Sequence, residues 1–281
     1  MRGLAEYVMS GRRQAATVAV LFGLIPMLNL LSAAVVALVT LRKGPQDGFL
    51  VMMWALLPAG MRWLSGDSAP VIMVIGVLLL AYLLRRTQSW QQVLVLATVL
   101  GVLLQLSLPL QQDYLAGIRA ALIRVMESSG GLPPTADGEG LTVEQATDQL
   151  LSVWISFYGA SHVLVFIVCV MIGRYWQALL YNPGGFQQEF HELRVDPRAM
   201  AVLALLLIGG LLGLQPVGDW IMLFCIVPSL CGLAVMHKIV AARKLNSGWL
   251  VLSYLLAMST PLIIVLGFVD SWTNIRRRMA Q

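Results

Sequence analysis

The chain has 281 residues, of which 58% are hydrophobic and only 12% charged, and its mean hydropathy is +0.79. A soluble domain carries roughly 25% charged residues, so this composition excludes a water-soluble fold and indicates an integral membrane protein. The net charge of +5 would suggest a nucleic-acid partner in a soluble chain. Here the Lys and Arg residues stand at the ends of apolar runs, where they act as topology signals, so we expect no nucleic-acid partner.

Apolar runs follow one another along the whole chain, and about 20 apolar residues are enough to cross a bilayer. The runs lie at about residues 14–41, 48–64, 69–84, 88–110, 149–173, 199–214, 217–236 and 248–269. They predict an all-α, polytopic transmembrane helical bundle of about eight spans, a multi-pass protein surrounded by membrane lipids. Residues 1–281 would form a single integral membrane domain.

The first run contains Pro26, which removes a backbone donor and can break a helix. If the run breaks there, Arg12 and Arg13 fall on the same side as Arg42, Lys43 and the later basic clusters, as the positive-inside rule requires. If the run crosses once, they fall on opposite sides. We favour the broken form. It leaves the arginines at 276–278 on the outer side unless the last run fails to cross or one short run is re-entrant.

Residues 111–148 carry six acidic and two basic side chains, which predicts an extracytoplasmic loop. Apolar residues recur at helical spacing over 113–127 and predict an amphipathic helix at the membrane surface. Residues 128–140 are rich in Gly and Pro and predict a flexible lid or linker. A capping-box pattern over 142–145 then begins a helix that can continue to about Leu180.

Polar side chains inside apolar runs are costly and therefore mark candidate sites. Tyr158 and His162 lie four residues apart, on one helical face. They form either a polar pocket or an interhelical hydrogen bond. Asn29 lies near Pro26 and either lines a pocket or repairs the broken backbone. Asp270 ends the last run and either pairs with a basic residue or a cation, or is neutralised by Asn274 and Arg277.

The cytoplasmic loop predicted at residues 181–198 begins with an Asn-Pro-Gly-Gly sequence that must end the preceding helix. This loop is either a simple helix exit or a partner-docking loop. In the docking interpretation, the loop binds a protein partner at the cytoplasmic face. The residues that would contact the partner are Asn182, Pro183, Gly184, Gly185, Glu189 and Arg194.

The run from Tyr175 to Arg194, with Gly267–Asp270 and the arginines that follow, resembles the YybS-like predicted membrane proteins of bacteria. That family has no established activity and is distantly similar to the substrate-binding S components of energy-coupling-factor vitamin transporters. The resemblance implies an S-component-like bundle, a small-molecule pocket near the outer face and a place in the bacterial inner membrane.

The sequence lacks the G-x-x-x-x-G-K-[ST], H-E-x-x-H and G-x-S-x-G motifs, so we expect no enzyme and no cofactor. Its three cysteines have no spacing suited to a metal site. Two functions remain ahead of an unrecognised lipid-acting enzyme. The first is binding and transport of a small molecule with an energy-supplying partner. The second is an interaction or envelope-assembly protein that docks through the Asn-Pro-Gly-Gly loop.

Overall fold

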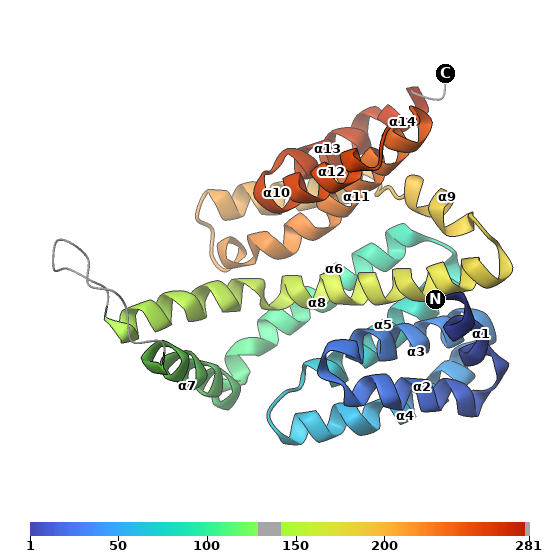
Figure 1. Ribbon diagram of the computed structural model, residues 1–281. Helices are drawn as coiled ribbons and strands as arrows, with labels where there is room; N and C mark the ends of the chain where they lie inside the picture. The colour runs from blue at the N-terminus through green and yellow to red at the C-terminus, as the bar shows by residue number, and fades with distance from the viewer. Residues whose placement is uncertain (129–141, 279–281) are drawn as a thin grey trace.

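The computed structural model describes residues 1–128 and 142–278, and every regular element in these two ranges is a helix. The all-α prediction is confirmed to that extent. In Figure 1 the long helix α8, with α6 crossing behind it, lies between an N-terminal group, α1 to α5, and a C-terminal group, α10 to α14. The elements are α1 (Arg2–Ser10), α2 (Arg12–Leu24), η1 (Pro26–Leu28), α3 (Asn29–Lys43), α4 (Pro45–Leu64), α5 (Ala69–Thr87), α6 (Trp90–Ser107), η2 (Leu108–Leu110), α7 (Gln112–Ser128), α8 (Val143–Tyr181), α9 (Gly185–His191), α10 (Pro197–Leu211), η3 (Val217–Trp220), α11 (Ile221–Ala242), α12 (Gly248–Ser259), α13 (Leu262–Thr273) and α14 (Ile275–Arg278).

The first apolar run is broken at Pro26, as the sequence predicts. Ile25 is extended, as a residue before proline prefers to be, and a single 3-10 turn separates α2 from α3. The Ser32 hydroxyl donates to the Ala19 carbonyl at 2.7 Å. These two residues lie about equally far along the chain from the break, one on each side of it. The two helices therefore form an antiparallel hairpin.

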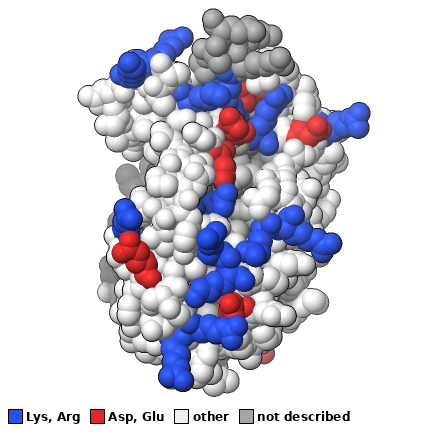
Figure 2. Space-filling view, turned by 90° about the vertical axis from the view of Figure 1, so that its right-hand side faces the viewer, with Lys and Arg blue, Asp and Glu red and all other residues white. Residues whose placement is uncertain are grey.

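This hairpin brings the N-terminal arginines to the same end of the bundle as the later basic clusters. Arg12 forms an ion pair with Asp47 at 2.6 Å, just after the end of α3. Arg85, at the end of α5, donates to the Leu41 carbonyl at 2.5 Å. Figure 2 looks onto this end and shows Lys and Arg side chains spread across it. We call it the basic end.

The core of the N-terminal group is α3, in which every residue from Ser32 to Leu41 is buried. Its small side chains allow α8 to come close. A Cβ added to Gly173 of α8 would lie 2.7 Å from the Ala37 Cβ and 3.0 Å from the Leu38 nitrogen. Such close packing of small residues is a common way for helices to associate in membranes.

The long helix begins and ends where local sequence signals predict. The Thr142 hydroxyl accepts from the Gln145 amide while the Gln145 side chain accepts from the Thr142 amide, a complete capping box. The helix ends at Tyr181, and Gly184 has φ +86°, which a side chain would strain. The helix predicted over 113–127 is present as α7, whereas the predicted linker over 128–140 lies almost entirely outside the described residues.

In the C-terminal group, α13 packs closely on α11 through glycines. A Cβ on Gly267 would lie 2.0 Å from the Pro228 carbonyl oxygen, and one on Gly232 would lie 2.0 Å from that of Ile263. These contacts place backbone directly against backbone. The sequence predicted an apolar run over 248–269 and left open whether this run crosses the membrane. In the structure α12 and α13 meet at an angle of 100° near Pro261.

The prediction of about eight spans is not confirmed. Five segments in the described ranges are long and apolar enough to cross a membrane, or six if the bent α12–α13 pair is counted as one span. They are Pro26–Lys43, Ala69–Thr87, Trp90–Leu110, Val143–Tyr181 and Val217–Ala242. The difference has a physical reason. Three of the eight predicted runs supply no qualifying helix of their own. The run 48–64 lies in α4, which is not among the five segments, α10 has only 15 residues, and the run 248–269 is divided between α12 and α13.

Candidate functional site

A polar pocket lies between α3, the α4–α5 turn, α5 and α8, and its volume is about 190 Å³. It contains two of the residues that the sequence singled out, Asn29 and His162. The others come from segments next to them in space. The lining residues are Asn29, Leu30, Arg62, Asp67, Ala69, Pro70, Met73, Ser161, His162 and Val165.

Chain connectivity explains why polar groups meet here. The break at Pro26 makes Asn29 the first residue of α3, at the end of the hairpin opposite Arg12 and Asp47. The α4–α5 turn lies at the same end, because α4 runs away from Asp47. The pocket therefore opens towards the end of the N-terminal group that lies opposite the basic end.

Arg62 and Asp67 supply charges that the sequence reasoning missed. Arg62 Nη2 donates to Asp67 Oδ2 at 2.5 Å, and Asp67 Oδ1 accepts from the Ala69 amide at the start of α5. Arg62 Nη1 is buried and has no hydrogen-bond partner among the described residues. The available signal was a pair of opposite charges five residues apart, on either side of a Ser-Gly turn.

His162 is 8% exposed, and its Nδ1 lies 2.8 Å from the Tyr158 carbonyl oxygen. Because a carbonyl only accepts, Nδ1 carries a proton, and in the neutral form of the ring Nε2 is then an acceptor. This bond stays within α8, and His162 makes no interhelical hydrogen bond to any described residue. The hydrogen-bonding pattern therefore favours the pocket interpretation over the interhelical one.

Aromatic rings continue from His162 along one face of α8. Tyr158 packs 4.6 Å from the His162 ring and 5.4 Å from that of Trp154, and Tyr114 of α7 packs on both Trp154 and Tyr158. The Tyr158 hydroxyl is buried and has no well-placed hydrogen-bond partner in the described ranges. Burial, followed by the influence of Tyr158 and Asp67, raises the pKa of Tyr114 to about 12. The four-residue spacing of 154, 158 and 162 was visible in the sequence, whereas the contribution of Tyr114 was not.

Asp270 lies elsewhere and is part of a different cluster. It is fully buried, and its Oδ2 accepts from Arg276 Nη2 at 2.7 Å and Nε at 3.0 Å. The predicted pairing of Asp270 with a basic residue is thus confirmed, and that residue is Arg276. Asn274 instead adopts a left-handed conformation, φ +50°, which turns the chain so that Arg276 folds back. Asp270 Oδ1 has no hydrogen-bond partner among the described residues.

The predicted docking loop is divided between the interior and the surface. Glu189 accepts from Arg174 and from the Trp90 indole at 3.0 Å, and Arg194 donates to the Ser271 carbonyl at 2.6 Å. Gly185 is buried. The other three residues, Asn182, Pro183 and Gly184, are exposed. Of the six residues predicted to dock a partner, these three are the exposed ones.

In chemical terms the pocket offers a cation and an anion at Arg62 and Asp67, an amide at Asn29, and an acceptor at His162. It is smaller than the 300–1,000 Å³ typical of sites for drug-sized ligands, so it suits a small polar solute. Among the described residues no three His, Cys, Asp or Glu side chains come together as metal ligands.

No protein-family model, curated protein or solved structure matches this chain. The resemblance to the YybS-like proteins, and with it the S-component-like fold, stays a prediction.

Proposed function

We propose that the protein is a multi-pass protein of the bacterial inner membrane that binds a small polar solute in this pocket and helps to transport it. The observation that carries the proposal is the meeting of Asn29, Arg62, Asp67 and His162 at one pocket. Asp67 and Nη2 of Arg62 satisfy each other, but Arg62 Nη1 is buried and has no hydrogen-bond partner among the described residues. An unpaired donor is expensive among apolar helices, so a ligand that satisfies it supports the proposal.

The distribution of Lys and Arg residues indicates from which side of the membrane the solute enters the pocket. Lys and Arg concentrate on the cytoplasmic side of membrane proteins, so the basic end faces the cytoplasm and the pocket faces the outside. The resemblance to S components implies a pocket near the outer face, in agreement with this orientation. Because the sequence holds no nucleotide-binding motif, a partner protein supplies the energy.

The test is mass spectrometry of small molecules that co-purify with the protein in mild detergent. We expect the wild type to retain a solute and His162→Ala and Asn29→Ala to lose it. His237→Ala is the matched control, since this histidine contacts Tyr254 and does not line the pocket. Thermal unfolding establishes that each variant is folded. Equal retention by all four proteins would refute the assignment of the pocket, and unchanged uptake of the solute by cells producing His162→Ala would refute transport.

A second function, docking of a protein partner at the basic end, is favoured by the exposed turn Asn182–Gly184. In this case the protein serves membrane-embedded interaction or envelope assembly. Replacing Gly184 and Gly185 with alanine would remove the partner from a pull-down. An unchanged set of partners would count against docking.

A further inference from the structure

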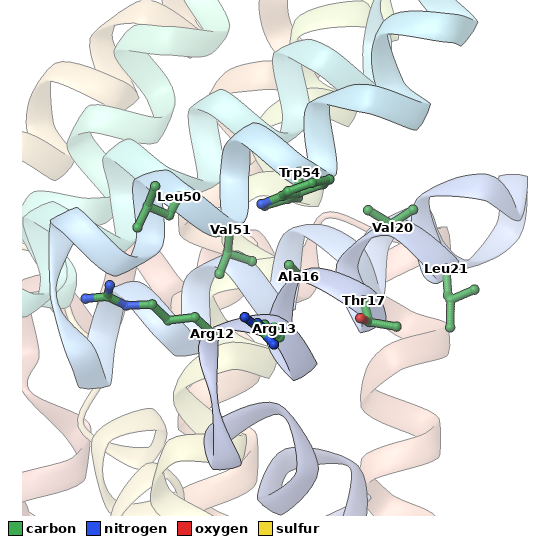
Figure 3. Close-up of a pocket in the computed structure, with 9 residues that line it drawn as sticks. All are labelled: Arg12, Arg13, Ala16, Thr17, Val20, Leu21, Leu50, Val51 and Trp54. Carbon is green, nitrogen blue, oxygen red and sulfur yellow. The ribbon is translucent and has the colours of Figure 1, made fainter.

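A groove of about 620 Å³ runs between α2 and α4 (Figure 3). It shares no lining residue with the solute pocket. Its walls are apolar over most of their length, with one hydroxyl at Thr17. The apolar lining residues are Ala16, Val20, Leu21, Leu50, Val51 and Trp54.

Two arginines stand at one end of the groove, and Leu21 stands at the other (Figure 3). Arg12 is neutralised by Asp47 at 2.6 Å. Arg13 is exposed, and no described residue forms an ion pair or hydrogen bond with it. Since α2 begins at Arg12, the positive end of its dipole adds to the charge at this end. The groove thus combines an apolar channel with one uncompensated cation.

The surface around the groove is also apolar. Leu21 is 55% exposed, Trp54 52% and Leu57 56%. In water such a patch would drive association, but in a bilayer it faces hydrocarbon. From Arg13 to Leu21 the helix rises about 12 Å, close to half of the roughly 30 Å hydrocarbon core. The groove therefore has the length of one leaflet, and its cationic end lies where that leaflet has its headgroups.

We propose that this groove binds one anionic phospholipid, with an acyl chain along α2 and α4 and the headgroup phosphate at Arg13. Basic pockets between helices at the cytoplasmic side of a membrane are suited to such headgroups. The proposal rests on the membrane placement stated above but not on the solute pocket, which has different lining residues. Arg12 has a smaller role because Asp47 already neutralises it.

Native mass spectrometry of the detergent-purified full chain tests this inference with two probes, phosphatidylglycerol and phosphatidylcholine of identical acyl chains. We expect phosphatidylglycerol to bind preferentially. A basic residue near an anionic headgroup contributes about fivefold in affinity, so Arg13→Gln lowers phosphatidylglycerol binding about fivefold. Arg13→Lys keeps the charge and retains most of the binding.

Two further variants separate charge from shape. Arg86→Gln is the matched control, because Arg86 is an exposed arginine in another basic cluster and does not line the groove. It leaves lipid binding unchanged. Ala16→Phe narrows the channel and lowers the binding of both lipids. Thermal unfolding confirms that each variant folds.

Equal binding of the two lipids, or an equal loss in Arg86→Gln and Arg13→Gln, would overturn the proposal by showing that the contact is not specific. A dimer that Ala16→Phe dissociates would overturn it in favour of a second copy of the chain. Failure of the solute proposal is distinguishable, since it leaves the lipid selectivity intact. A chain that stays soluble and monodisperse without detergent would refute the membrane placement, and with it both proposals.

Discussion

Separating Asp270 from Arg276 is expected to destabilise the protein more than the loss of any exposed ion pair. Asp270 is fully buried and Arg276 is 4% exposed. Arg276 also donates to the carbonyls of His191 and Leu193, both at 2.7 Å. The pair therefore fastens the segment between α9 and α10 to the end of α13.

The expected magnitudes follow from which charge is left behind. Asp270→Ala leaves a buried guanidinium without its carboxylate, and Arg276→Ala leaves a buried carboxylate without a donor among the described residues. Removing one partner of a buried pair costs about 3–5 kcal/mol in the free energy of unfolding. The double variant leaves no charge and loses mainly the two bonds to the loop carbonyls, at about 3 kcal/mol in all. The coupling free energy is then about 3 kcal/mol or more, since the two single losses are not additive.

Equilibrium unfolding in mixed detergent micelles measures these free energies for the wild type, both single variants and the double variant. Arg243→Ala is the control, because Arg243 is exposed at the end of α11. It should change the free energy of unfolding by less than about 0.5 kcal/mol. If the losses of the single variants simply add in the double variant, the two side chains are not coupled and the reasoning is wrong.

Three smaller perturbations test other features. Gly267→Ala drives a Cβ into the Pro228 carbonyl and should cost about 1–3 kcal/mol, whereas Gly60→Ala, with open space around it, should be neutral or stabilising in the same unfolding assay. Gly184→Ala forces a side chain into a left-handed conformation and should lower the unfolding free energy by about 1 kcal/mol; an unchanged value would refute the strain. Burial, together with the positive charges of Lys238 and Arg276, lowers the pKa of His191 in the folded protein. The unfolded chain therefore takes up a proton at this histidine at a higher pH than the folded protein does. Stability should therefore fall as the pH drops below about 6.5, and His191→Gln should reduce that fall; identical pH profiles for the two proteins would contradict the assignment.

The features that the sequence predicts correctly are those fixed by neighbouring residues. Pro26 breaks the first run because its ring excludes a helical hydrogen bond, wherever the segment lies. The capping box at Thr142 needs only Gln145. The end of α8 needs only the turn residues that follow Tyr181, of which Gly184 takes a positive φ. Local chemistry decides each of these without help from the rest of the fold.

The features that sequence reasoning misses depend on long-range packing or on a bend. Arg276 reaches Asp270 only because Asn274 turns the chain and the carbonyls near His191 take the remaining donors. Hydropathy reveals an apolar run over 248–269 but not the 100° bend between α12 and α13, although Pro261 marks its position. The number of spans therefore changes while the helical class does not.

Asp270 and His162 were both predicted as site residues because each is a polar residue in an apolar run. The structure nevertheless gives them different surroundings. Burial does not separate them, since their exposed fractions are 0% and 8%. The two residues differ in whether a charge on the side chain is neutralised and in whether the side chain borders a pocket. The carboxylate of Asp270 is neutralised by a buried cation of its own chain, whereas His162 lines an open pocket and keeps a free acceptor. Asp270→Ala should therefore reduce stability and leave ligand retention by the remaining folded protein intact, and His162→Ala should do the reverse. The opposite outcome would mean that a buried ion pair, not a neutral imidazole, marks the binding site.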